Sequence, residues 1–339
     1  MKYKSVVVTR LGDPEVLRVL DNELRLPSAR EVRIRILAAA VCRPDVTARR
    51  GEAFYSGTPL GQKPPFVPGY AIIGVVDAIG NKVVEVRVGD RVGALTVLGG
   101  YSEYLYWRSD RLISVPVSVD PAEAVTLVLN YIVAYQVLHR SARVKSGDSA
   151  LIIGASGGIG TALMQLGRLA GLKMYGIASQ KKHAILRDNG VTPIDYRTQD
   201  FTEVIRHSEP EGVDAVFNGM MSLDYIRRSV SVLKPKGKLV GYGEPKDLRE
   251  FMRILWILLK VNLLSNRGSF KLYGTSPYFL GYRRPFIEDW AILFRLLEEG
   301  KIKPVITKRY PILSAARANS LLECGQVAGN VVLLSPELL

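Results

Sequence analysis

A glycine-rich turn in the middle of the chain lies between a short apolar run, Ser149–Ile153, and a helical pattern. After the turn, Leu163, Leu166 and Leu169 recur at the spacing of one helix face. Glycines permit a tight turn and let backbone N–H groups approach an anion, while the helix N-terminus adds a partial positive charge. The pattern therefore predicts a site for the pyrophosphate of a dinucleotide. The predicted contacts are Gly154, Ala155, Ser156, Gly157, Gly158, Ile159 and Gly160.

The end of the next apolar run, residues 174–178, indicates which dinucleotide binds. A site for NAD usually carries Asp or Glu there, and that carboxylate accepts hydrogen bonds from the ribose 2′-OH. This chain instead has Ser179, with Lys181 and Lys182 just beyond it. Because a hydroxyl and two ammonium groups suit a 2′-phosphate, the sequence predicts NADP(H) rather than NAD(H).

Two other motifs overlap this part of the chain, and neither is favoured. Residues 154–158 also fit G-x-S-x-G, the nucleophile elbow of α/β-hydrolases, with Ser156 as the nucleophile. That chemistry needs a later Asp and then a His, usually near the chain end, whereas the last histidine here is His207.

The second motif is a Tyr-x-x-x-Lys pair, Tyr242 and Lys246, like that of short-chain dehydrogenases. In those enzymes both side chains must share one helix face. Gly243 and Pro245 lie between them here and break a helix, so we interpret the pair as a coincidence.

The composition excludes several classes of protein. The 339 residues suffice for about two domains with ample core. The net charge is +14, yet the basic residues are spread in short groups without interleaved aromatic side chains, so we predict no nucleic-acid partner. A basic surface also attracts an anionic cofactor. Cys42 and Cys324 cannot build a disulfide framework, and the N-terminus lacks the apolar run of a secretory signal, so we expect a cytoplasmic protein.

The most hydrophobic stretch is Leu248–Leu264, which is shorter than a membrane span and carries Arg249, Arg253 and Lys260. We therefore predict no transmembrane segment. On a helix this stretch has a wide apolar face and a narrow basic stripe, which favours packing on the core or at a subunit interface. A lid over an apolar substrate and a contact with a membrane surface are the alternatives.

The first part of the chain is rich in strand-like segments, and strands alternate with helices afterwards. Asp120, Pro121 and Glu123 predict a helix start, as the N-cap, first and third helical residues. The nucleotide is expected at the carboxyl ends of the parallel strands, with reacting groups coming largely from the β-rich part. Strands are predicted at residues 4–8, 32–40, 71–79, 91–95, 104–107, 112–115, 213–217, 238–242 and 329–334, and an amphipathic helix at 286–297.

Further short motifs are spread along nearly the whole chain. They are Cys42-Arg43-Pro44-Asp45, Pro65-Phe66-Val67-Pro68-Gly69-Tyr70, Val88-Gly89-Asp90-Arg91-Val92, Asn130-Tyr131, Val144-Lys145-Ser146-Gly147-Asp148, Ile194-Asp195-Tyr196 and the run LLEEGKIKP at 296–304. With the glycine turn, they resemble the medium-chain dehydrogenase/reductase superfamily, and within it the zinc-free quinone oxidoreductase branch of the zeta-crystallin type.

This resemblance implies an α/β protein of two domains. A GroES-like, β-rich catalytic domain is built from both chain ends, at residues 1–124 and 269–339. A Rossmann domain with a doubly wound parallel sheet is inserted between them, at residues 125–268. The resemblance also implies a homodimer or homotetramer.

Zinc-dependent members of the superfamily place a cysteine where Cys42 stands and then a Gly-His-Glu, whereas this chain has Gly69-Tyr70-Ala71. Zinc needs several N, S or O ligands, and no histidine of this chain lies near a partner cysteine in the sequence. We therefore predict no metal, and we interpret Cys42 as a small pocket or core residue. The histidines are His139, His183 and His207.

Without a metal, hydrogen-bond donors must stabilise negative charge on the substrate oxygen as hydride arrives. The candidates are Tyr70, which replaces the zinc-binding histidine, and Asn130 and Tyr131. Asp45 matches a pocket position of the quinone reductases and would orient a water or the ribose. Each candidate also has a structural alternative, since a tyrosine on an apolar helix is more often a core residue. Relatives usually carry Thr in contact with the nicotinamide where this chain has Val133.

The remaining cofactor contacts follow from strand ends and from the resemblance. Tyr196 is expected near the adenosine, and Asn218, Gly241 and Gly243 are expected on the nicotinamide side. We predict a zinc-independent, NADPH-dependent reductase of a small hydrophobic quinone or α,β-unsaturated carbonyl. The alternatives are an enoyl-thioester reductase and a catalytically weak NADPH-binding or membrane-associated protein.

Overall fold

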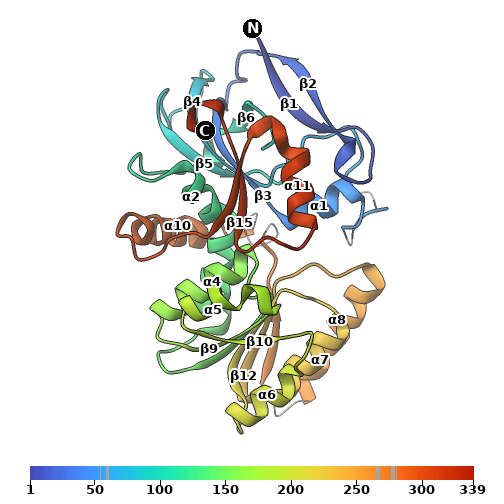
Figure 1. Ribbon diagram of the computed structural model, residues 1–339. Helices are drawn as coiled ribbons and strands as arrows, with labels where there is room; N and C mark the ends of the chain where they lie inside the picture. Colours follow the sequence, from blue (N-terminus) through green and yellow to red (C-terminus); the bar gives the residue numbers. More distant parts are fainter. Residues whose placement is uncertain (54, 59–60, 265–267, 276–278, 280) are drawn as a thin grey trace. The chain divides into compact units, whose positions relative to one another are not determined.

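The computed structural model describes residues 1–53, 55–58, 61–264, 268–275, 279 and 281–339 (Figure 1). These residues form two compact units, each with its own sheet and core. The first unit comprises Met1–Glu52, Ser56–Leu129 and Arg284–Leu339, and the second comprises Ala53–Tyr55 and Asn130–Arg283. Both ends of the chain therefore belong to one unit, and most of the other unit is inserted between them in the sequence.

Among the described residues, the first unit holds nine strands. They are β1 (Lys2–Val8), β2 (Leu17–Glu23), β3 (Glu31–Val41), β4 (Ala71–Ile79), β5 (Arg91–Leu95), β6 (Tyr104–Arg108), β7 (Ile113–Ser114), β14 (Ile306–Pro311) and β15 (Asn330–Leu334). Seven of them form one sheet in the order β14-β15-β3-β4-β5-β7, with β6 paired to β3, and β1 and β2 form a separate ribbon. Within the sheet only β14 and β15 run parallel. The helices of this unit include α1 (Arg43–Arg50), α2 (Pro121–Thr126), α10 (Arg283–Glu298) and α11 (Ala315–Glu323).

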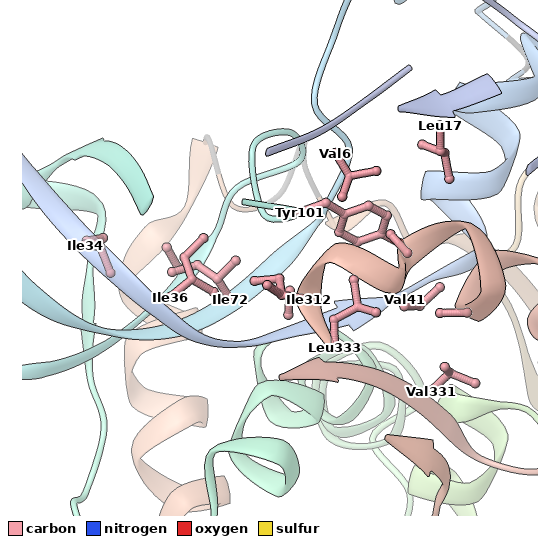
Figure 2. Close-up of a cluster of buried hydrophobic side chains, with 14 of the residues drawn as sticks. Val6, Leu17, Ile34, Ile36, Val41, Ile72, Tyr101, Ile312, Val331 and Leu333 are labelled. Carbon is pink, nitrogen blue, oxygen red and sulfur yellow. The ribbon is translucent and has the colours of Figure 1, made fainter. Parts of the chain in front are cut away.

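Strand β3 runs through the middle of the core of this unit. Its residues 31–35 alternate between half-buried and buried positions, whereas residues 36–41 are buried throughout. The first pattern is typical of a strand with one covered face, and the second of a strand that is covered on both. Figure 2 shows the resulting cluster, in which Ile36 and Val41 of β3 lie with Tyr101 and with Val331 and Leu333 of β15.

The second unit is a six-stranded parallel sheet in the order β10-β9-β8-β11-β12-β13. Its strands are β8 (Ser149–Ile153), β9 (Lys173–Ala178), β10 (Val191–Asp195), β11 (Val213–Asn218), β12 (Leu233–Gly241) and β13 (Ser269–Leu272). This is the doubly wound Rossmann order. The strands are all parallel, and the order in which the chain adds them to the sheet changes direction between β8 and β11. The predicted fold class is confirmed. The helices are α4 (Gly158–Leu169), α5 (His183–Asp188), α6 (Phe201–Ser208), α7 (Leu223–Ser231) and α8 (Leu248–Leu264).

A long apolar helix, Pro121–Ala142, contains the change from the first unit to the second, which falls between Leu129 and Asn130. It starts as predicted, because the Asp120 carboxylate accepts a hydrogen bond from the Ala122 N–H. Two π-helical stretches interrupt it. Its length and apolarity match a membrane span, but 83% of its apolar 18-residue stretch is buried inside the protein, as in a core helix. Its successive parts are α2 (Pro121–Thr126), η3 (Leu127–Tyr131), α3 (Ile132–Tyr135) and η4 (Gln136–Ala142).

Candidate functional site

The glycine turn connects β8 to α4 in a conformation that only small residues allow. Gly154 has a φ of 83°, in the left-handed region that favours glycine. A Cβ atom on Gly160 would lie 2.3 Å from the Gly154 carbonyl oxygen and 2.4 Å from that of Ala155, so the helix packs directly on the turn. This close approach is the role of the third glycine in a dinucleotide-binding fingerprint.

The first turn of α4 presents backbone donors at the end of β8. Gly157 is the N-cap residue, and the first helical N–H groups, from Gly158 onward, have no partners within the helix. The first turn carries no acidic side chain that would repel an anion. The partial positive charge of a 12-residue helix therefore points at the turn, and a pyrophosphate fits this cradle.

The polar residues after β9 lie at the same edge of the sheet as the glycine turn. β9 ends at Ala178, Ser179 follows in an extended conformation, and Gln180–Lys182 forms the short 3₁₀ turn η5. Ser179 and Lys182 are half-buried and Lys181 is exposed. Because β8 and β9 are adjacent and parallel, a 2′-phosphate at Ser179 and a pyrophosphate at Gly154 suit one dinucleotide.

The neighbouring strands end in the other candidate cofactor residues. Tyr196 follows β10 and is 51% exposed, which leaves its ring accessible. Asn218 ends β11 but is fully buried: its Oδ1 accepts a 2.8 Å hydrogen bond from the Met220 N–H. The Asn218 side chain thus holds the turn after β11.

Gly241 and Gly243 lie where the chain passes closely over its neighbours. A Cβ on Gly241 would lie 2.5 Å from the Met221 sulfur, and one on Gly243 would lie 2.2 Å from the Gly219 carbonyl oxygen. Both glycines therefore allow close packing at the ends of β11 and β12.

Tyr242, whose spacing from Lys246 we interpret as a coincidence, also lies at this edge of the sheet. Its backbone N–H donates to the Asn218 carbonyl over 3.0 Å, and its ring atoms lie near Gly219. Burial raises the pKa of its hydroxyl, which therefore stays protonated. The Asn218-Gly219 pair directly after a buried strand could have predicted that a large side chain lies here, because a glycine leaves room for a large neighbour.

Asp45 lies in the first unit at the centre of a buried hydrogen-bond network. Its carboxylate accepts from the Cys42 N–H at 2.8 Å, the Gly69 N–H at 2.9 Å and the Tyr101 hydroxyl at 3.1 Å. The Tyr70 N–H also contributes a hydrogen bond. Burial raises the pKa of Asp45 to about 7, although these four donors oppose the shift. The carboxylate is thus occupied by partners of its own unit.

The segment that carries Tyr70 is fixed on both sides. Gly69 has a φ of 116°, and a Cβ there would lie 2.4 Å from the Gly100 Cα, so no larger residue fits. The Tyr70 carbonyl accepts from the Thr96 N–H over 2.9 Å, while its side chain is half-buried. Asp45 and its partners therefore set the position of the Tyr70 backbone.

Asn130 and Tyr131 lie in the second unit, at the end of η3. Tyr131 is fully buried, and its hydroxyl donates a 2.8 Å hydrogen bond to Gln165 Oε1 on α4. Asn130 is half-buried, and its side chain or backbone has an interaction partner within the protein. Because the Tyr131 hydroxyl has a single hydrogen, it would have to leave Gln165 before it could donate to a substrate.

In the part of the chain that the structure describes, no group of three or more His, Cys, Asp or Glu side chains is placed to hold a metal ion. Cys42 is buried, and burial together with the nearby Asp45 raises the pKa of its thiol, which disfavours the thiolate that binds zinc. Cys324 is exposed and lies near the C-terminal end of the chain, directly after α11.

Two protein families match this chain. The family described as alcohol dehydrogenase GroES-like domain matches residues 28–117, and the one described as zinc-binding dehydrogenase matches residues 190–333. The chain is 32% identical to a human synaptic vesicle membrane protein VAT-1 homolog over 325 residues, which covers 91% of this chain and 80% of the relative. It is 30% identical to a 2-haloacrylate reductase of Burkholderia sp over 339 residues, which covers 97% of this chain and 98% of the relative.

A human quinone oxidoreductase is 29% identical over 341 residues, with 98% of this chain and 97% of the relative covered. Among solved structures, the CurK enoyl reductase superposes with a TM-score of 0.85 at 25% identity, over 98% of this chain and 99% of that one. The fold and these similarities define an oxidoreductase that uses a nicotinamide cofactor. The chain belongs to the medium-chain dehydrogenase/reductase superfamily.

Proposed function

We propose that this protein is an NADPH-dependent reductase that transfers hydride to a small hydrophobic quinone or α,β-unsaturated carbonyl. The observation that carries the preference for NADPH is the end of β9, where Ser179, Lys181 and Lys182 replace the usual carboxylate. The relatives named quinone oxidoreductase and 2-haloacrylate reductase support the class of acceptor. Both names describe reduction of a conjugated system.

In the proposed complex, each group of this chain has one task. The N–H groups of the glycine turn bind the pyrophosphate, and Ser179 and Lys182 bind the 2′-phosphate, with Lys181 as a substitute. Tyr196 lies near the adenosine. NADPH supplies the hydride when it is bound. Tyr70 or Asn130 is the proposed donor to the substrate oxygen on which negative charge develops.

Asp45 has an indirect role in this proposal. Its carboxylate is held by the Cys42, Gly69 and Tyr101 donors, so it positions the Gly69–Tyr70 backbone and does not touch the substrate. Tyr131 is likewise a positioning residue, since its hydroxyl is bonded to Gln165. The proposed reaction needs no metal ion. We propose further that the protein is a cytoplasmic homodimer or homotetramer.

Two other functions are favoured by specific observations. The similarity to CurK enoyl reductase favours an enoyl-thioester acceptor, which uses the same hydride chemistry. Val133 in place of the usual Thr, together with the vesicle-protein relatives, favours an NADPH-binding protein with little turnover.

The decisive experiment is a turnover assay with NADPH or NADH and one acceptor of each type: a naphthoquinone, a 2-alkenal and a crotonyl thioester. We expect NADPH oxidation with the quinone or the alkenal, and much slower oxidation of NADH. Faster turnover of the thioester would favour the enoyl-thioester reductase. Binding of NADPH, seen as a change in its fluorescence, without oxidation by any acceptor would favour the binding protein.

A further inference from the structure

The second unit exposes a continuous apolar stripe along α8. Five large apolar side chains recur every three or four residues, so they share one face of the helix, and each is between 53% and 72% exposed. The opposite face packs on the core of the unit through the buried Ile254 and Val261. The helix has 17 residues and is therefore roughly 25 Å long. The stripe consists of Leu248, Met252, Trp256, Leu259 and Leu263.

A row of basic side chains borders this stripe. Arg249, Arg253 and Lys260 are exposed, and helical geometry places them together on one flank of the apolar face. Over the described residues, no ion pair or hydrogen bond involves the side chain of Arg249 or Arg253. The Lys260 ammonium lies 4.2 Å from the centroid of the Trp256 ring. The one acidic side chain in the described part of α8, Glu250, is half-buried and accepts a 2.7 Å hydrogen bond from the Lys246 N–H. The fully exposed face of this helix thus combines apolar and positive groups.

Helix α7 adds a further cation to this surface. A depression of about 420 Å³ lies against α7 and α8, and the exposed Arg227 of α7 faces it together with Arg253. Its walls also include Met252 and Trp256 of the stripe. A phosphate group would find two guanidinium groups there, next to apolar side chains.

We propose that this face of α8 binds an anionic lipid surface. The apolar stripe enters the boundary between headgroups and acyl chains, while Arg227, Arg249, Arg253 and Lys260 contact lipid phosphates. Trp256 suits such a boundary, because its ring is apolar and its indole N–H is polar. Lys260 suits it too, because its stem is apolar and its ammonium reaches the headgroups.

Charge decides between a lipid surface and a second copy of this chain. Two stripes packed antiparallel about a two-fold axis would bring the two basic rows together, and Glu250, the one acidic side chain in the described part of α8, is half-buried and already accepts from the Lys246 N–H. An anionic membrane supplies an apolar layer and negative charge side by side. The proposal does not rest on the proposed reductase activity, since no residue of α8 is among the candidate catalytic or cofactor residues.

The test uses the full chain and sedimentation with vesicles of phosphatidylcholine, either pure or with roughly a third of phosphatidylserine. We expect at least about tenfold tighter binding to the anionic vesicles, and weaker binding at high salt. Arg249→Glu with Arg253→Glu should weaken this binding at least about tenfold. The matched control, Arg30→Glu with Arg87→Glu, reverses two exposed charges of the first unit and should bind far better than the α8 variant.

A second pair of variants tests the apolar stripe. Leu259→Gln with Leu263→Gln should release the protein from anionic vesicles, whereas Val84→Gln with Val117→Gln, at even more exposed apolar positions elsewhere, should not. Trp256→Phe should keep the binding but abolish a blue shift of tryptophan emission on binding, because the other two tryptophans, Trp107 and Trp290, lie outside α8.

Three results would overturn the proposal. One is equal binding of the two arginine double variants to anionic vesicles. Another is equal binding of the native chain to neutral and anionic vesicles. The third is a self-association that the Leu259 and Leu263 changes abolish, without vesicle binding by the native chain, which would identify a second copy as the occupant.

Discussion

At the scale of single residues, the proposed preference for NADPH depends on three side chains after β9. A carboxylate at the position of Ser179 would repel a 2′-phosphate, whereas a hydroxyl and two ammonium groups attract it. A hydrogen bond to a charged group contributes about 1.5–3 kcal/mol, which is enough to separate two cofactors that differ only in this phosphate.

Replacing Lys182 by Ala should therefore raise the KM for NADPH by roughly tenfold or more and leave the KM for NADH nearly unchanged. Steady-state kinetics with both cofactors and one acceptor measures this split. Lys308→Ala, which removes an exposed lysine of β14, serves as the control for the loss of one positive charge. An unchanged KM for NADPH would place the phosphate elsewhere.

The raised pKa of Asp45 predicts that the stability of the protein depends on pH. Its pKa is raised from 3.8 to about 7 in the folded chain, so the folded state holds a proton that the unfolded state has lost between these values. The contribution of this group to stability is therefore full below about pH 4 and is lost as the pH rises through about 7, with a slope of at most about 1.4 kcal/mol per pH unit.

Urea unfolding at a series of pH values, for the native chain and for Asp45→Asn, measures this contribution. The variant cannot titrate at this position, and its amide would point N–H groups at N–H and O–H donors, which costs about 1–3 kcal/mol for each donor left unpaired. The stability difference between the two proteins should shrink as the pH rises from about 5 to about 8. Parallel pH profiles would show that Asp45 does not titrate in this range.

At the scale of elements, the strand β8, the glycine turn and α4 act as one unit. The helix approaches the turn so closely that a Cβ on Gly160 would lie 2.3 Å from a backbone oxygen, whereas a Cβ on Gly157 would lie 3.5 Å from its nearest neighbour. The same methyl group is therefore expected to have different effects at two positions three residues apart.

Gly160→Ala should lower the free energy of unfolding by about 1–3 kcal/mol and weaken NADPH binding, because the helix must move away from the turn. Gly157→Ala should cost less than about 1 kcal/mol, the usual loss at a helix N-cap. Thermal unfolding and fluorescence titration with NADPH measure the two effects. Equal losses for the two variants would contradict the close packing of α4 on the turn.

At the scale of the whole molecule, the superfamily contains zinc-dependent members, and one matching family is described as zinc-binding. Here the residue in place of the zinc-binding histidine is Tyr70, and Cys42 carries a thiol whose pKa is raised by burial. Elemental analysis of the purified protein should find far less than one zinc per chain, and a chelator should leave the reductase activity unchanged. Stoichiometric zinc that depends on Cys42 would refute this prediction.

Local patterns were sufficient for most of the elements. The strand at 149–153, the helix after it and the start of the helix at Pro121 depend on neighbouring residues, whose spacing fixes backbone conformation directly. Four strands were not predicted, because they are short or lie at edges with exposed side chains: β2, β10, β13 and β14. Pairing with a neighbour, which no local pattern encodes, makes them strands.

By itself, the sequence determined the family, the Rossmann unit and the polar end of β9, because glycine positions and hydrophobic spacing act over a few residues. Only the tertiary structure decided what the side chains do. Asp45 finds partners at Gly69 and Tyr101, far away in the chain, and the Tyr131 hydroxyl finds Gln165. Periodicity also showed that Leu248–Leu264 is apolar on most sides, but only packing decided which face is buried and which faces solvent.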